Sequence, residues 1–201
     1  MKRLRLIEAG LMSAVCCACS STPVHYYTLL RPTPTPSELT SAACCRVQIR
    51  RVVIPREVDR PELVTRSGED EAMVLSNATW LAPLRDEIRD ALTSQIDLKL
   101  VQATAVEPAA RAPEPVVFVN VTRFESVPAQ YVLVSANWRI QRTDLPKATS
   151  LTCETTARIA VKSGVSAIVQ GYQQAIVKIA DQIALDLLDA GRIATRRCTS
   201  G

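Results

Sequence analysis

The chain has 201 residues, a length that fits one domain with some residues left for a tether or targeting segment. Apolar residues make up 47% and charged residues 22%, the balance of a globular protein. The net charge is only +4, and three positive charges lie in the first five residues, which argues against a nucleic-acid binder because such proteins concentrate basic residues on one face. The single histidine, His25, excludes a zinc site built on several histidines, and any His-dependent nucleophilic catalysis would need this residue.

Residues 1–18 are typical of a signal peptide, because a basic start is followed by a short apolar segment that ends in small residues. Cys19 follows an alanine and precedes polar residues, the arrangement in which bacterial lipoproteins carry their lipidated cysteine. Cys16 and Cys17 stand in poorer cleavage contexts. We predict lipidation at Cys19 and a tether over residues 19–23; an ordinary secreted protein with unusual cysteines is the alternative.

The other cysteines leave the redox state open. An exported chain lies in an oxidising compartment, but the spacing does not say whether Cys44 or Cys45 reaches Cys153 or Cys198. In the simplest interpretation, Cys153 is a small core residue on a strand. The chain has no CxxC pair and no second histidine, so we expect no metal site.

Short strand patterns come first along the chain. Residues 25–30 (HYYTLL) favour a strand and are followed by three prolines that neither a helix nor a central strand tolerates. Residues 46–54 alternate well enough for a strand. Residues 63–66 and 72–75 predict a hairpin across the glycine-containing turn 67–70.

A helix is predicted next, capped by Thr79 or a neighbour, with Pro83 in its first turn. Its apolar face is formed by residues at helical spacing: Leu84, Ile88, Ala91, Leu92 and Ile96. Residues 103–115 contain three prolines and few large apolar groups, which indicates a loop.

Three strands and a long helix complete the chain. Residues 116–125 are so apolar at their start that a strand buried on both faces is expected. Residues 131–141 and 151–162 alternate, so each predicts a strand with one solvated face. The helix over residues 166–190 would end at Gly191, a suitable C′ residue, with one apolar stripe: Ile168, Tyr172, Ile176, Ile179, Ile183 and Leu187.

This element order predicts an α+β fold in which an antiparallel or mixed β-sheet is covered on one face by two amphipathic helices. Residues 24–201 would form a single periplasmic domain. We expect it to fold cooperatively, because neither helix should be stable without the sheet.

The candidates for chemistry are few, and phosphate loops and GxSxG patterns are absent from the sequence. Clustered charges are expected to be solvated, with contact of either arginine pair with lipid head groups as the alternative. His25 is expected to be a strand residue. Trp80 and Trp138 could anchor a binding surface, but core packing is expected for Trp138. The clustered charges are Glu69, Asp70 and Glu71 in the turn, Asp181, Asp186 and Asp189 on the last helix, and the pairs Arg50–Arg51 and Arg196–Arg197.

Several segments in order resemble the PqiC/YmbA-type auxiliary lipoproteins of ABC-type transport systems. The likeness covers residues 19–190 and includes Trp80–Leu84, although its Ala82-Pro83 step is one residue shorter than the common form. The Cys44-Cys45 pair also departs from the family pattern. The other matching segments are residues 19–21 (CSS), 26–29 (YYTL), 52–55 (VVIP), 58–66 (VDRPELVTR), 121–125 (VTRFE) and 136–140 (ANWRI).

The resemblance implies a lipid-anchored, periplasm-facing accessory subunit of a Gram-negative envelope lipid-trafficking system, which supports membrane integrity. The implied partner is an MCE-domain transporter component (PqiB-like), and phospholipid is a further candidate ligand. The family implies no enzyme activity and no cofactor, so only the lipidation role passes to Cys19. Ser20 after Cys19 resembles the signal for sorting to the outer membrane. The transported lipid and self-association stay open.

Two other classes stay open at this point. One is a stand-alone structural or assembly lipoprotein of the envelope. The other is a secreted enzyme that uses His25 or the acidic turn.

Overall fold

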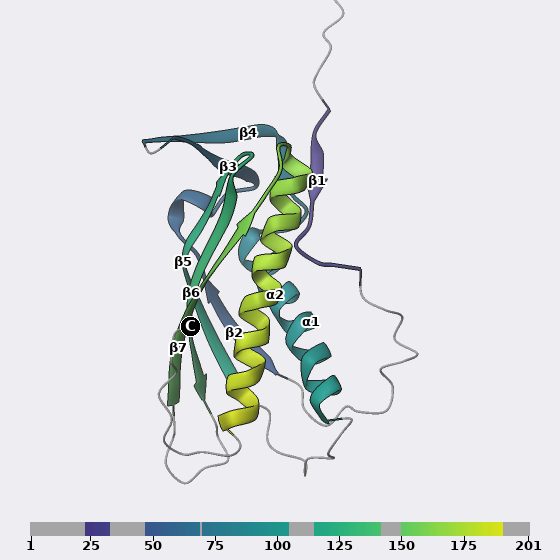
Figure 1. The fold of residues 1–201 in the computed structure, drawn as a ribbon, viewed down its shortest axis with the longest axis vertical. Coiled ribbons are helices and arrows are strands. Elements are labelled where there is room, and N and C mark those ends of the chain that lie inside the picture. Colours follow the sequence, from purple (N-terminus) through teal and green to yellow (C-terminus); the bar gives the residue numbers. More distant parts are fainter. Residues whose placement is uncertain (1–22, 33–46, 69, 105–114, 142–149, 191–201) are drawn as a thin grey trace, which may run out of the picture.

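The computed structural model describes residues 23–32, 47–68, 70–104, 115–141 and 150–190, which form two helices and two mixed sheets (Figure 1). The predicted α+β class is confirmed, although the strands form two sheets rather than one. In chain order the elements are β1 (His25–Tyr27), β2 (Gln48–Val53), the 3-10 turn η2 (Arg56–Val58), β3 (Glu62–Ser67), β4 (Glu71–Trp80), α1 (Leu84–Thr104), β5 (Val116–Val127), β6 (Tyr131–Gln141), β7 (Ser150–Ala160) and α2 (Val165–Ala190).

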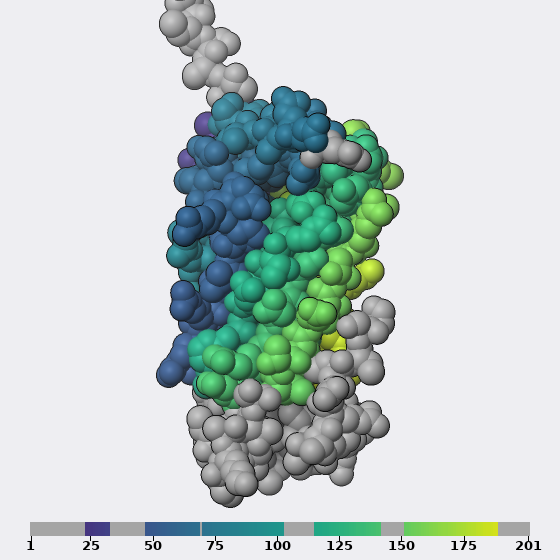
Figure 2. Space-filling view, turned by 90° about the vertical axis from the view of Figure 1, so that its left-hand side faces the viewer, coloured from purple at the N-terminus to yellow at the C-terminus, as the bar shows by residue number. Residues whose placement is uncertain are grey.

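The larger sheet has four strands in the order β2-β5-β6-β7. β2 runs parallel to β5, and the other two pairs are antiparallel. Both helices lie on one face, α2 across β6 and β7 and α1 beside β2 (Figure 1). Figure 2 looks onto the opposite face, where the strands lie side by side without a helix over them.

The smaller sheet, of order β1-β4-β3, lies across one end of the molecule (Figure 1). β3 and β4 form the predicted hairpin, and Gly68 in its turn has a φ of 86°, a conformation that glycine adopts without strain. The strand continues to Trp80, so the expected cap residue Thr79 is part of β4 instead. Pro83 lies just before α1 rather than in its first turn.

The core lies between the larger sheet and the helices. The stripe of α2 is buried as predicted from Ile168 to Ile183, and Leu187 is partly buried. α2 packs closely on the sheet at Gly171, where an added Cβ would lie 2.5 Å from Val161 Cγ1 and 3.1 Å from Val132 Cγ2. A side chain at this position would therefore require the helix or Val161 to shift.

Aromatic packing fills the core where the two sheets meet. The rings of Phe124 and Tyr172 stack with centroids 3.9 Å apart, and Trp80 meets both of them edge-on. Burial raises the pKa of the Tyr172 phenol. Trp138 is buried as expected, and Trp80 is buried too, so neither indole is available at the surface.

Two local expectations are wrong. Residues 116–125 are not buried on both faces, because one face of β5 is half-buried or exposed and no helix covers it. The helix α1 continues through Thr104, past the residue at which a loop was expected to begin. In the part of the chain that the structure describes, no helix is sufficiently long and apolar to span a bilayer.

Candidate interaction surface

The strand β1 carries the first apolar surface feature. It pairs in parallel with the last three residues of β4, and Leu81 N donates a 2.8 Å hydrogen bond to Tyr27 O. Tyr27 packs against the core, whereas Tyr26 is 65% exposed and is flanked by exposed Val24 and Leu81. Val24, Tyr26 and Leu81 form what we call the apolar rim.

Two polar side chains hold the segment that follows β1. Glu87, only 3% exposed near the start of α1, accepts hydrogen bonds from Thr28 Oγ1 at 2.7 Å and Leu29 N at 2.8 Å. From α2, Gln173 Nε2 donates to Thr28 O at 3.0 Å. A buried carboxylate needs such donors. The chain after Tyr27 is therefore clamped between the two helices.

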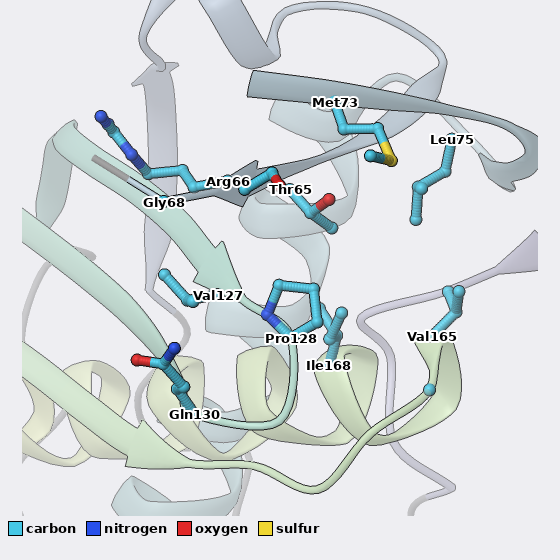
Figure 3. Close-up of a pocket in the computed structure, with 12 residues that line it drawn as sticks. Thr65, Arg66, Gly68, Met73, Leu75, Val127, Pro128, Gln130, Val165 and Ile168 are labelled. Atoms are coloured by element: carbon cyan, nitrogen blue, oxygen red, sulfur yellow. The ribbon is translucent and has the colours of Figure 1, made fainter. Parts of the chain in front are cut away.

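A groove of about 410 Å³ opens beneath the hairpin (Figure 3). Met73 and Leu75 point into it from β4, facing side chains of the β5–β6 turn and the first turn of α2. Beside the groove, Ser126 Oγ of β5 donates a 3.4 Å hydrogen bond to Val64 O of β3, which joins the hairpin to the larger sheet. The walls are mainly apolar and include Thr65, Val127, Pro128, Val165 and Ile168.

The outer edge of the hairpin is open as well. β1 pairs only with Ala78–Trp80, so among the described residues the first half of β4 has a strand partner on one side only. Met73 and Val74 on this half are 47% and 39% exposed. An open edge with exposed apolar side chains is a surface to which a partner can add a strand.

Charged side chains lie beneath the hairpin near its turn. Arg123 donates to both oxygens of Glu125, at 2.8 and 3.0 Å, and these hydrogen bonds hold the pKa of Glu125 below its ordinary value. Arg66 on β3 lies 4.0 Å from the same carboxylate. The carboxylate is thus neutralised from two strands and is not poised to take up a proton near neutral pH.

The structure does not bring the sequence candidates together into a reactive cluster. His25 is exposed on β1, and Asp70 and Glu71 are exposed at the hairpin turn as expected. In the described ranges no three His, Cys, Asp or Glu side chains are grouped so that they could hold a metal ion. Several predicted residues lie outside the described residues: Cys19, Cys44, Cys45, Glu69, Gly191, Arg196, Arg197 and Cys198.

The expectation of solvated carboxylates on the last helix is wrong for Asp186. This residue is only 8% exposed, and its Oδ2 accepts a 3.0 Å hydrogen bond from the buried Trp138 Nε1. Asp181 pairs with Lys99 of α1 at 3.2 Å. Asp186 therefore joins α2 to β6, and Asp181 joins α2 to α1. The helical spacing alone did not reveal these roles.

Cys153 answers part of the open redox question. It is buried on β7 opposite Trp138, as expected of a core residue, but it is also disulfide-bonded. Its partner lies outside the residues that the structure describes, which contain no other cysteine.

Comparisons with known proteins agree with this architecture. A family model described as "ABC-type transport auxiliary lipoprotein component" matches residues 27–184. A search of curated proteins finds no match.

Two solved structures share the fold at 16% sequence identity. The first, described only as an uncharacterized protein, has a TM-score of 0.64 and aligns over 83% of this chain and 99% of its own. The second, from Xanthomonas campestris and assigned to a family of unknown function, has a TM-score of 0.58 over 84% of this chain and 96% of its own. At this identity the likeness concerns the fold alone.

Proposed function

The chain belongs to the family of ABC-type transport auxiliary lipoprotein components, and from this premise we propose that it is a non-catalytic, lipid-anchored subunit that acts by binding a transporter component. The proposed partner is an MCE-domain protein of a Gram-negative lipid-trafficking system, and the proposed role is to support membrane integrity. The proposed location is the outer membrane, facing the periplasm.

The observation that carries the proposal is the open hairpin end. Met73 lines the groove, Val74 is exposed beside it, and the edge of β4 lacks a second strand partner among the described residues. Exposed apolar side chains that cluster in one place often mark a protein interaction surface. An extended apolar segment of the transporter component could pair with β4 and place side chains in the groove.

The anchor would act through β1. A tether over residues 19–23 spans at most about 18 Å, so a lipidated Cys19 would keep β1 and the hairpin near the membrane. Two acyl chains anchor a protein stably where one does not. Tethering raises the effective concentration of the docking surface for a partner at the same membrane.

Mass spectrometry of the mature N-terminus tests the anchor. We expect a diacylated Cys19 as the first residue of the mature chain. An unmodified Cys19, or cleavage elsewhere, would contradict this part of the proposal while leaving partner binding to its own test.

Photocrosslinking in cells tests partner binding. A crosslinking residue replaces Met73 in one variant and Leu185, which is 56% exposed near the end of α2, in a matched control. We expect position 73 to capture an MCE-domain or other transporter subunit and position 185 not to do so. If neither position recovers such a subunit from cells that express the transporter, a stand-alone envelope lipoprotein becomes the better explanation.

A further inference from the structure

The helix-free face of the larger sheet carries a second hollow, a notch of about 370 Å³. It belongs to the start of β5 and the end of β6, whereas the groove lies beside the β5–β6 turn. Val127 is nine positions after Phe118 along β5, so the notch and the groove are roughly 30 Å apart. The side chains that define the notch are Arg51, Phe118, Asn120, Asn137, Arg139 and Thr152.

The strand register places an arginine on each side of a phenylalanine. Arg51 pairs with Phe118 across β2 and β5, and Phe118 pairs with Arg139 across β5 and β6. With strands about 4.8 Å apart, the two arginine Cα atoms are about 10 Å apart. The Arg139 guanidinium carbon lies 5.0 Å from the centre of the Phe118 ring, so this side chain leans toward the middle of the row.

A bulge in β2 leaves two consecutive arginines exposed at this edge of the sheet. The register between β2 and β5 shifts between Ile49 and Arg51, and both Arg50 and Arg51 are exposed. Bulges redirect side chains in this way at sheet edges. The Arg50-Arg51 pair is therefore presented beside the notch rather than being divided between solvent and core.

Several described arginines are paired with a carboxylate, but the two arginines of the notch are not. Arg60, Arg85, Arg89 and Arg123 all form ion pairs. Among the described residues, neither Arg51 nor Arg139 does, and no acidic side chain lines the notch. The nearest acidic position in the register is Glu154, which lies opposite Asn137 in the next row.

Three of the other wall residues supply neutral hydrogen-bond donors, and Val53, Val119 and Trp138 complete the wall. Asn120 and Asn137 each offer an amide NH₂ group, and Thr152 offers a hydroxyl. Arginine guanidinium groups match the oxygens of a phosphate in bidentate geometry. Phe118 provides an apolar floor between the two arginines. A small concave site that is rich in donors and free of carboxylates fits a compact oxyanion with an attached organic body.

We propose that this notch binds the phosphate group of a phosphate ester. The ester is either a soluble metabolite or the headgroup of a phospholipid, two sources that offer the same phosphate chemistry. Arg51 and Arg139 contact the phosphate oxygens, and Phe118 packs against the organic part. This site goes beyond the proposed docking function, which uses the other end of the molecule.

Titration of the full chain in maltoside micelles tests the proposal, with side-chain amide NMR shifts of Asn120 and Asn137 as the readout. The probes are glycerol 3-phosphate in solution and phosphatidylglycerol added to the micelles, with glycerol and diacylglycerol as phosphate-free controls. Binding of either phosphate probe, with at least a ten-fold loss in Arg51→Gln and in Arg139→Gln, supports the site. The probe that binds more tightly identifies the source.

Arg158→Gln is the matched control, because Arg158 is an exposed arginine of the same sheet that stacks over Tyr131 at 3.9 Å, outside the notch. It removes the same charge and an equivalent ring contact. Equal weakening by Arg158→Gln would overturn the proposal, since net charge alone would then explain binding. So would the absence of binding to both phosphate probes at millimolar concentration, or binding of an acidic peptide in their place. Loss of partner crosslinking at position 73 would not affect any of these outcomes.

Discussion

The body of the domain and its hairpin end use apolar side chains differently. In the body, the α2 stripe and the inner faces of β5, β6 and β7 are almost fully buried. In the smaller sheet, Met73 and Val74 remain substantially exposed, and the first half of β4 has a strand partner on one side only among the described residues. Burial of apolar area drives folding, so the body supplies the stability and the hairpin keeps apolar surface available for binding.

The largest expected effect comes from breaking the body. Ile176→Asp places an unpaired charge at a position that is only 1% exposed, so we expect a loss of about 4 kcal/mol or more. Thermal unfolding should show either no folded protein or a melting temperature lower by roughly 8–16 °C. Leu185→Asp, at an exposed position on the same helix, should change stability by about 0.5 kcal/mol or less. An unchanged melting temperature for Ile176→Asp would mean that α2 is not docked on the sheet.

A smaller loss is expected at Gly171, where α2 packs closely on the sheet. Gly171→Ala gains about 1 kcal/mol of helix propensity, but the new methyl group would collide with Val161 and Val132. We expect a net destabilisation of about 1–2 kcal/mol in denaturant unfolding. The double variant Gly171→Ala/Val161→Ala should recover part of this loss. No recovery would contradict a steric cause.

The sequence predicted the individual helices and strands better than the pairing of the strands, and the reason is physical. Alternation along residues 131–141 and the stripe from Ile168 to Ile183 are local patterns, because burial on one face repeats with the period of the element. The partner of a strand is not a local property. The parallel pairs β1–β4 and β2–β5, and the division into two sheets, therefore had no signal in the spacing.

The same limit applies to the candidate sites. His25 was placed correctly on a strand and Asp70 in an exposed turn, but the sequence did not reveal the buried roles of Glu87 and Asp186, since a helical pattern treats any carboxylate as solvated. The Arg51–Phe118–Arg139 row depends on the register of three strands that are distant in sequence. The pair Arg50-Arg51 was its only visible sign.

Glu87→Gln should have the smallest effect on global stability. It also tests most directly whether the smaller sheet and the body differ in stability. The amide can still accept a hydrogen bond, but it loses the charge that strengthens the bonds from Thr28 Oγ1 and Leu29 N. We expect a loss of about 1–2 kcal/mol that is concentrated in β1. Hydrogen exchange should therefore speed up over residues 25–30, while amides of α2 from Ile176 to Ile183 keep their protection. Asp90→Asn, at an exposed position on the same helix, is the control for loss of a negative charge. Equal loss of protection in α2 would show that β1 and the body unfold as one unit. Unchanged exchange over residues 25–30 would show that β1 is held by its pairing with β4 rather than by the hydrogen bonds to Glu87.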